Sequence, residues 1–177
     1  MQKIRNGDSC AAGLFVEKYY SPIYQYCFLH IRDRECAEDM AQETFVRFFE
    51  ALMKGTDIRK IKSYLYRIAG NIIKNDYRKK KEILNEDLQD TAVGDLTEAE
   101  IRMDIERALA RLPEDIRETA ILFFFQGLKQ KEISDLLNIK VSLVKYRVSK
   151  AKRITGKTVG GGNEVKKYQS KIGAIKP

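Results

Sequence analysis

Apolar residues recur at intervals of three and four along most of the chain, which is the period of amphipathic helices. In the N-terminal half this pattern predicts long helices over 11–29, 37–53 and 61–80, with a loop over 55–60. The positions predicted to face inward in the second and third helices are Ala41, Phe45, Phe48, Leu52, Ile61, Leu65, Ile68 and Ile72. No segment alternates apolar and polar residues as a half-buried strand does, so an all-α fold is expected.

The same period continues in the second half of the chain. A helix is predicted from 97 to 111, and Pro113 suits the first turn of the next helix, over 114–126. The apolar run 121–125 lies inside this longer amphipathic segment and is therefore interpreted as buried helix. Gly127 is positioned to end the helix with a left-handed backbone.

Two short helices follow, over 130–137 and 141–153, and Asn138 between them tolerates a left-handed turn. The predicted core positions of this pair are Ile133, Leu136, Leu137, Ile139, Val141, Val144, Val148 and Ala151. The opposite face of the second helix carries Ser142, Lys145, Tyr146, Ser149 and Arg153. A turn of this kind before a basic helix is typical of a helix-turn-helix that enters the DNA major groove. The alternative is an ordinary helical pair with a solvated basic face.

Charge is divided into blocks along the chain, and the formal net charge is +8. Residues 59–81 hold nine Lys or Arg and one acid, and residues 129–153 hold eight Lys or Arg and two acids. Between them, residues 82–104 hold eight acids and one base. Two basic blocks around an acidic one indicate two nucleic-acid contacts joined by a linker that avoids DNA.

Several other classes of protein find little support. The N-terminus has no apolar signal core and no run is long enough to span a membrane, so a cytoplasmic protein without membrane contact of its own is expected. Cys10, Cys27 and Cys36 form no CxxC pair and are expected to be reduced, buried thiols. His30 is the single histidine. No catalytic set, metal site or cofactor is therefore predicted, and the chain is not expected to be an enzyme.

Two further helix faces are candidate binding surfaces. The outer face of helix 61–80 combines cations, amides and an aromatic ring: Tyr64, Arg67, Asn71, Lys74, Asn75 and Arg78. Cations suit phosphates, and an exposed ring can stack on an unpaired base. The alternative is a solvated face on which Tyr64 and Tyr66 pack at the domain edge. The outer face of helix 37–53 is acidic, with Glu38, Asp39, Gln42, Glu43 and Glu50. It is either a docking surface for a basic protein or a solvated face.

These segments, in this order, resemble the extracytoplasmic-function (ECF) sigma factors of bacterial RNA polymerase. The resemblance lies in AEDMAQETFVRFFEAL (37–52), SYLYRIAGNIIKNDYRKK (63–80), ALARLPEDIRETAILFFFQGLKQKEISDLLNI (108–139) and VKYRVSKAK (144–152). It implies two small helical domains joined by a flexible acidic linker. Region two would cover 8–81, the linker 82–96 and region four, with the helix-turn-helix, 97–155. Residues 156–177 are expected to form a disordered tail.

The resemblance also assigns roles to the candidate surfaces. Docking on the β′ clamp helices of core RNA polymerase falls to Asp39, Gln42 and Glu43. Contact with the −10 element falls to Tyr64, Arg67, Asn71, Lys74, Asn75 and Arg78, and a flipped base would be held by the loop 55–62. Contact with the −35 element falls to Ser142, Lys145, Tyr146, Arg147, Ser149, Lys150 and Arg153, with the two arginines on phosphates.

The expected function is thus that of a sigma factor, a monomer when free, which brings core polymerase to promoter DNA and aids strand opening. Its implied partners also include the polymerase β flap and an anti-sigma factor. The alternative is a stand-alone helix-turn-helix regulator that binds operator DNA. One departure from the family concerns Lys140, which cannot accept hydrogen bonds as an N-cap should. Ser142 is the alternative cap, and it would shift the start of the recognition helix.

Overall fold

The computed structural model describes residues 1–83 and 105–156, and neither range contains a strand. The chain forms two compact units, residues 1–91 and 92–177. These observations confirm an all-α protein of two helical domains. The predicted tail from 157 onward lies outside the described residues, and so do linker residues 84–96 and the first part of the helix predicted from 97.

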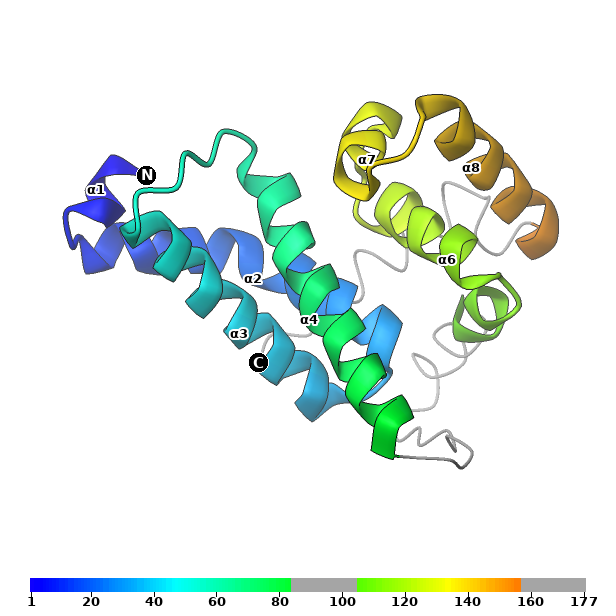
Figure 1. Ribbon diagram of the computed structural model, residues 1–177, viewed down its shortest axis with the longest axis horizontal. Coiled ribbons are helices and arrows are strands. Elements are labelled where there is room, and N and C mark those ends of the chain that lie inside the picture. Colours follow the sequence, from blue (N-terminus) through cyan, green and yellow to red (C-terminus); the bar gives the residue numbers. More distant parts are fainter. Residues whose placement is uncertain (84–104, 157–177) are drawn as a thin grey trace. The chain divides into compact units, whose positions relative to one another are not determined.

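Within residues 1–83, the N-terminal unit contains four helices (Figure 1). They are α1 (Gln2–Arg5), α2 (Ser9–Ile31), α3 (Arg34–Met53) and α4 (Ile61–Ile83). The long helices α2, α3 and α4 each pack against the other two. Asp8 and Asp33 cap α2 and α3: their carboxylates accept hydrogen bonds from Ala11 N at 2.9 Å and Cys36 N at 2.7 Å. Such caps satisfy amide groups that have no partner inside the helix.

An aromatic cluster forms the core of this unit. Phe15 of α2 stacks on Phe48 of α3 with ring centroids 4.8 Å apart, and Tyr26 of α2 meets Tyr66 of α4 edge-on at 5.1 Å. The predicted inward residues of α3 are all buried. On α4 the prediction was wrong for Ile61 and Ile68, which are half-buried. The core face of α4 is rotated toward Tyr66, because α2 offers aromatic partners on that side.

The three thiols have different environments, which corrects the expectation that all would be buried. Cys27 is fully buried, Cys36 is half-buried and Cys10 is exposed. Burial raises the pKa of Cys27 from its ordinary value of 9.0 to about 12. The Cys27 thiol is therefore protonated and unreactive at neutral pH. Burial also raises the pKa of the neighbouring Tyr66.

In the described part of the C-terminal unit, residues 105–110 are helical. It continues with α6 (Glu114–Ala120), the π-helical segment η1 (Ile121–Phe125), α7 (Gln130–Leu137) and α8 (Val141–Thr155). The expected uninterrupted α-helix over 114–126 is thus corrected. It changes to π-helical spacing at 121, where the amide of Gln126 bonds to the carbonyl of Ile121 at 3.1 Å. Gly127 ends the segment with φ +63°, as predicted.

A single arginine closes the turn between residues 105–110 and α6. Arg117 Nε donates to the carbonyl of Leu109 at 2.9 Å, and its Nη2 donates to that of Leu112 at 3.1 Å. A longer bond of 3.4 Å reaches the carbonyl of Ala110. The carbonyl of Leu109 also accepts the amide of Leu112 at 3.1 Å, whereas the carbonyl of Leu112 lies past the helix end, where intrahelical donors are missing. The Arg117 side chain therefore connects the start of the C-terminal unit to the helix beneath the helix-turn-helix.

The predicted core of the helix-turn-helix is partly correct. Of the residues predicted for it, Ile133, Val144, Val148 and Ala151 are buried. Leu136, Leu137 and Ile139 are half-buried, because each lies at the edge of this small unit. Val141 is 36% exposed, since it opens α8 beyond the packed stripe. Thr155, four residues after Ala151, fills the last buried position of the stripe instead.

Candidate nucleic-acid interface

The turn between α7 and α8 is fixed by its own hydrogen bonds. Asn138 has φ 54° and ψ 47°, the left-handed conformation expected from the sequence. Ser134 Oγ donates to the carbonyl of Ile139 at 2.6 Å, and the amide of Ile139 donates to the carbonyl of Ser134 at 3.1 Å. At the other end of α7, Glu132 accepts from the amide of Lys129 at 2.7 Å. These bonds hold α7 and α8 as a helix-turn-helix.

The outer face of α8 carries most of the predicted −35 residues together. Exposed on it are Ser142, Lys145, Tyr146, Ser149 and Arg153. Lys150 is half-buried, and its Nζ lies 5.5 Å from the ring centroid of Tyr146, which is itself 55% exposed. Such a cation–π contact between positions i and i+4 orients both side chains. The face thus offers hydroxyls, cations and one ring to a ligand.

The start of α8 differs from the expectation about its cap. Lys140 is the N-cap residue, with an extended backbone and no side-chain cap hydrogen bond. The helix begins at Val141, so Ser142 lies inside the first turn and does not act as the cap. The amides of Leu143 and Val144 bond to the carbonyl of Lys140. Because the start is not shifted, Ser142 stays on the exposed face with the other candidates.

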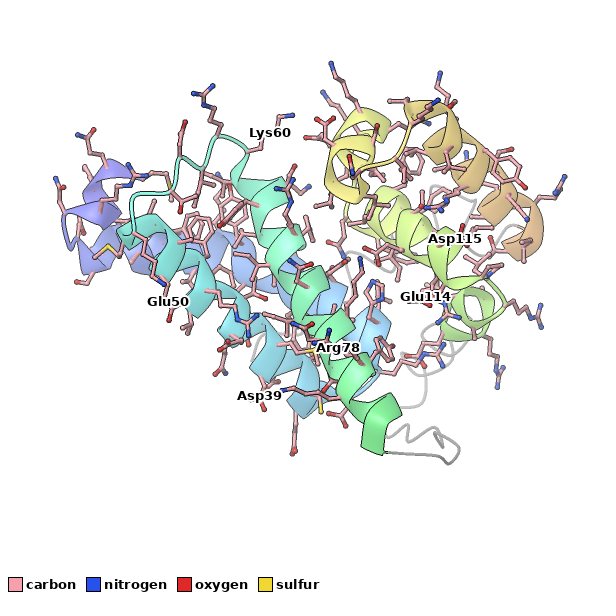
Figure 2. All side chains as sticks on the ribbon, in the orientation of Figure 1. Asp39, Glu50, Lys60, Arg78, Glu114 and Asp115 are labelled. Atoms are coloured by element: carbon pink, nitrogen blue, oxygen red, sulfur yellow. The ribbon has the colours of Figure 1, made fainter. Side chains whose placement is uncertain are left out.

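Arg147 is the predicted −35 residue that the structure separates from the rest. Its side chain is 16% exposed, and Nη2 lies 2.8 Å from Oδ2 of Asp115 on α6. Figure 2 shows Asp115 on α6, in the same unit. In this conformation Nη2 is engaged by a carboxylate of the same unit. The phosphate contact expected of Arg147 stays a prediction.

The predicted −10 residues share one face of α4. Exposed along it are Arg67, Asn71, Lys74, Asn75 and Arg78. Tyr64 is half-buried, because its ring packs edge-on against Phe48 with centroids 6.1 Å apart. It therefore offers only part of its ring to a base. Tyr66 is 1% exposed and belongs to the core, as the alternative interpretation proposed for it.

The loop before α4 is shaped by contacts that sequence reasoning missed. Gly55 has φ +84°, and Asp57 pairs with Arg59 at 2.8 Å. Arg5 of α1 donates to the carbonyl of Thr56 at 2.7 Å, which links the N-terminus to a loop 51 residues away (Figure 1). Helix α1 has four residues, too few for a hydrophobic period to reveal it.

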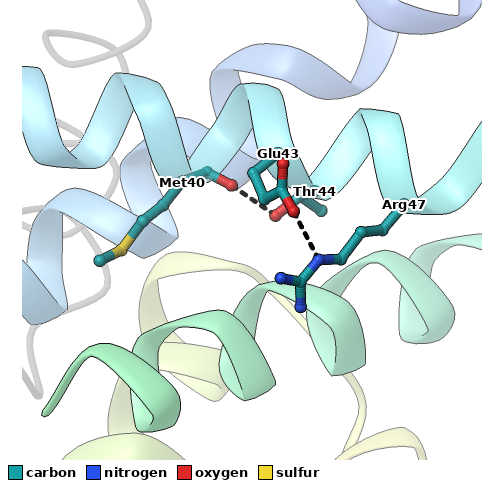
Figure 3. Close-up of polar contacts among 4 residues, drawn as sticks. All are labelled: Met40, Glu43, Thr44 and Arg47. Atoms are coloured by element: carbon teal, nitrogen blue, oxygen red, sulfur yellow. Dashed lines mark hydrogen bonds and ion pairs between the residues drawn. The ribbon is translucent and has the colours of Figure 1, made fainter. Parts of the chain in front are cut away.

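The outer face of α3 is more varied than its charge pattern indicates. Asp39 and Gln42 are exposed, whereas Glu43 is half-buried and binds Arg47 Nε at 2.7 Å (Figure 3). Two apolar side chains lie on the same face: Val46 is 52% and Met53 63% exposed. The sequence alone could have placed these two residues on this face, because they follow Gln42 at helical intervals of four and eleven residues.

The inner edge of this face includes Tyr20 of α2. Partial burial and the nearby carboxylate of Glu38 raise the pKa of the Tyr20 hydroxyl, while a hydrogen bond with Gln42 acts in the opposite direction. The hydroxyl is therefore neutral at physiological pH. Figure 2 shows Asp39 and Glu50 along the outer edge of α3, so carboxylates extend over much of its length.

Among residues 1–83 and 105–156, no group of His, Cys, Asp and Glu side chains is arranged to hold a metal ion. No helix in these ranges is long and apolar enough to cross a membrane.

Comparison with known proteins identifies the two units. The sigma-70 region 2 family matches residues 15–83, and the sigma-70 region 4 family matches residues 102–154. RNA polymerase sigma factor SigZ of Bacillus subtilis is 35% identical over 140 residues, covering 77% of this chain and 80% of SigZ. ECF RNA polymerase sigma factor SigW of the same organism is 31% identical over 169 residues, covering 86% of this chain and 90% of SigW.

The fold has counterparts among solved structures. A chain in the structure of CnrH in complex with the cytosolic domain of CnrY matches with a TM-score of 0.71 and 21% identity, covering 90% of this chain and 94% of that one. A chain in the co-crystal structure of the sigma factor RpoE with the anti-sigma factor NepR from Bartonella quintana matches with a TM-score of 0.70 and 19% identity. That match covers 84% of this chain and 96% of the other.

The chain belongs to the ECF sigma factors of bacterial RNA polymerase. It is a transcription initiation factor that directs polymerase to specific promoters. The stand-alone regulator is not favoured, because the N-terminal unit matches sigma region two in addition to the helix-turn-helix of region four.

Proposed function

We propose that α8 reads the −35 element from the major groove. The exposed face of α8 supports this, because it is the surface on which a helix-turn-helix places hydroxyls, amines and a ring together. Lys145, Tyr146 and Ser149 lie near its middle and would contact base edges. Lys150, whose Nζ lies 5.5 Å from the ring centroid of Tyr146, would clasp the duplex beside that ring, and Arg153 would bind phosphate.

On this proposal, α4 favours the melted −10 strand over the closed duplex. Arg67, Lys74 and Arg78 would bind phosphates, and Asn71 and Asn75 would meet exposed base edges. Duplex stacking holds roughly 1.4 kcal/mol per base-pair step. Stacking of one unpaired base on a ring contributes about 1–3 kcal/mol when the ring is accessible. The half-buried Tyr64 would supply the lower part of that range, so the loop 55–60 and polymerase must supply the remainder.

The face of α3 is the proposed docking site for core polymerase, through the β′ clamp helices. Asp39, Gln42 and Glu50 would form its polar rim, and Val46 and Met53 would be buried on binding. Exposed apolar side chains surrounded by charge are typical of protein interfaces. Glu43 is the less available member of the predicted set, because it already binds Arg47. Region four would contact the polymerase β flap.

An anti-sigma factor is the other proposed partner. Both solved structures described above contain a chain bound to a second protein, which in one is the anti-sigma factor NepR and in the other the cytosolic domain of CnrY. The free chain is proposed to be a monomer. Because core polymerase and promoter DNA are in the bacterial cytoplasm, that is where it would act.

Run-off transcription tests the site assignment. The purified chain is added to bacterial core polymerase with a fragmented genomic library, and start sites that depend on the chain define its promoters. Lys145→Ala should alter −35 preference, with a loss of about tenfold on the preferred sequence. Asn75→Ala should leave promoter binding intact but reduce strand opening, measured by permanganate reactivity.

Lys131→Ala is the matched control, since Lys131 is exposed on α7 and not on α8. Normal transcription from the Lys145 and Asn75 variants would show that these two faces do not contact the promoter.

A further inference from the structure

The two sides of α8 that flank its buried stripe each carry a cation directed back toward the preceding segment. The stripe consists of Val144, Val148, Ala151 and Thr155. With about 100° between successive helical residues, Arg147 lies about 60° to one side of Val144 and Lys152 about 80° to the other. Arg147 binds Asp115 of α6, and Lys152 Nζ lies 5.8 Å from the ring centroid of Phe124 in η1. The two contacts thus oppose rotation of α8 in opposite directions.

The Arg147 contact is the stronger of the two. Its Nη2 lies 2.8 Å from the Asp115 carboxylate, and the arginine side chain is 16% exposed while the aspartate is 54% exposed. The Nε atom is buried without a hydrogen-bond partner. Asp115 is in the first turn of α6, where the helix dipole favours a carboxylate. An arginine buried to this degree, with one acid as its partner, is held in one orientation.

We propose that the Asp115–Arg147 pair sets the rotation of the recognition helix, so that Arg147 is a positioning residue for −35 recognition and not a phosphate contact. The inference rests on the proposed reading of the −35 element by α8. A rotation of about 20° would move side-chain atoms by about 2 Å on a helix about 10 Å across, whereas hydrogen-bond distances vary by only about 0.5 Å. A small loss of register would therefore disturb every base contact of α8 together.

Salt dependence separates this role from a direct contact. Each phosphate that a protein neutralises contributes about 0.9 to the slope of log affinity against log salt concentration. A phosphate-binding arginine therefore lowers that slope when it is replaced by glutamine. A positioning arginine lowers discrimination between −35 sequences and leaves the slope unchanged.

The experiment uses holoenzyme assembled from the full chain and core polymerase, on a promoter recovered by run-off transcription and on a copy with a substituted −35 base. Affinity is measured over a range of salt concentrations for wild type, R147Q, D115N and R153Q. R153Q is the matched control, because Arg153 is on the exposed face and is the proposed phosphate contact. We expect R153Q to lower the slope by about 0.9.

We expect R147Q and D115N to keep the wild-type slope and to lose about tenfold in discrimination at the −35 element. D115N is included in case R147Q does not fold. Asp115 is more than half exposed, so its replacement should leave the fold of the unit intact. A lower slope in R147Q would overturn the proposal and make Arg147 a phosphate contact. Tighter, more salt-dependent binding by D115N would also overturn it, because the freed arginine would then have reached DNA. If R153Q leaves the slope unchanged, α8 does not bind the duplex as proposed, and both the −35 reading and this inference fail.

Discussion

Replacing Arg117 by methionine tests whether one side chain holds the C-terminal unit together at its beginning. Methionine preserves much of the length of the arginine stem but cannot donate a hydrogen bond. The change removes the bonds to the carbonyls of Leu109 and Leu112, at 2.9 and 3.1 Å, and the weaker one at 3.4 Å to Ala110. Leu109 and Leu112 are 1% and 2% exposed, so water has poor access to replace these donors.

The magnitude follows from the two short bonds, of which only the one to Leu112 leaves a carbonyl without a donor, because the Leu109 carbonyl keeps the amide of Leu112 at 3.1 Å. A buried carbonyl left without its donor destabilises a fold by about 1–3 kcal/mol. Loss of the second hydrogen bond at Leu109 adds about 0.5–1.5 kcal/mol, so the total is about 2–4 kcal/mol. Arg117→Lys retains the charge and a donor that can reach one carbonyl. It should therefore lose roughly half as much stability.

Hydrogen exchange followed by mass spectrometry measures this effect unit by unit in the full chain. Peptides from α7 and α8 should exchange about 30-fold faster or more in Arg117→Met, because their protection reports opening of the C-terminal unit. Peptides from α3 are the internal control and should be unchanged, since α3 belongs to the other unit. An increase below about threefold in α7 and α8 would refute the reasoning, because it would mean that water satisfies both carbonyls in the variant.

Two further predictions concern the N-terminal unit. Between pH 9.0 and 10.0 the Cys27 thiol is protonated in the folded chain but increasingly ionised in the unfolded one, so stability should fall as pH rises, by at most about 1.4 kcal/mol per pH unit. Cys27→Val removes this titration and should flatten the fall, as measured by urea unfolding; an equal slope in both proteins would contradict the assigned burial. Met53→Glu should weaken binding to core polymerase about tenfold with unchanged helicity by circular dichroism, because it places a charge where an apolar contact is proposed. Unchanged binding in a competition assay would remove Met53 from the docking site.

The hydrophobic pattern predicted the positions of the helices well because burial controls them. The limits of α7 match the prediction, and Asn138 adopts the left-handed turn that its side chain tolerates. Features that depend on contacts between distant residues were missed. The π-helical segment at 121–125 is an example, because the sequence ILFFF fits an α-helix and a π-helix equally well. Helix α1 is another, since its position depends on Ile4 packing and on Arg5 reaching Thr56.

In the candidate sites, too, the sequence predicted which faces are exposed but not which single side chains make contacts with distant residues. Periodicity placed the outer faces of α4 and α8 correctly, and their polar residues are exposed as groups. It did not show which polar side chains are already engaged by another element of the fold. Arg147 of α8 binds Asp115 of α6, and Tyr64 of α4 packs against Phe48 of α3. A charge on the edge of a helix has both solvent and a neighbouring helix within reach, and only the fold determines which of them it meets.

This distinction changes how the net charge of region four should be interpreted. Residues 129–153 hold eight Lys or Arg, and counting each as a phosphate contact would predict a very steep salt dependence. Arg147 is bound to a carboxylate and Lys152 is directed to an aromatic ring, so these two cations hold α8 in place. Lys129 and Lys131 lie at the start of α7, outside the exposed face of α8. The cations of α8 and its N-cap that are left for DNA are Lys140, Lys145, Lys150 and Arg153. The contribution of α8 to the salt slope should therefore be near four contacts and not eight, which is a further reason why such a chain needs polymerase to hold it on a promoter.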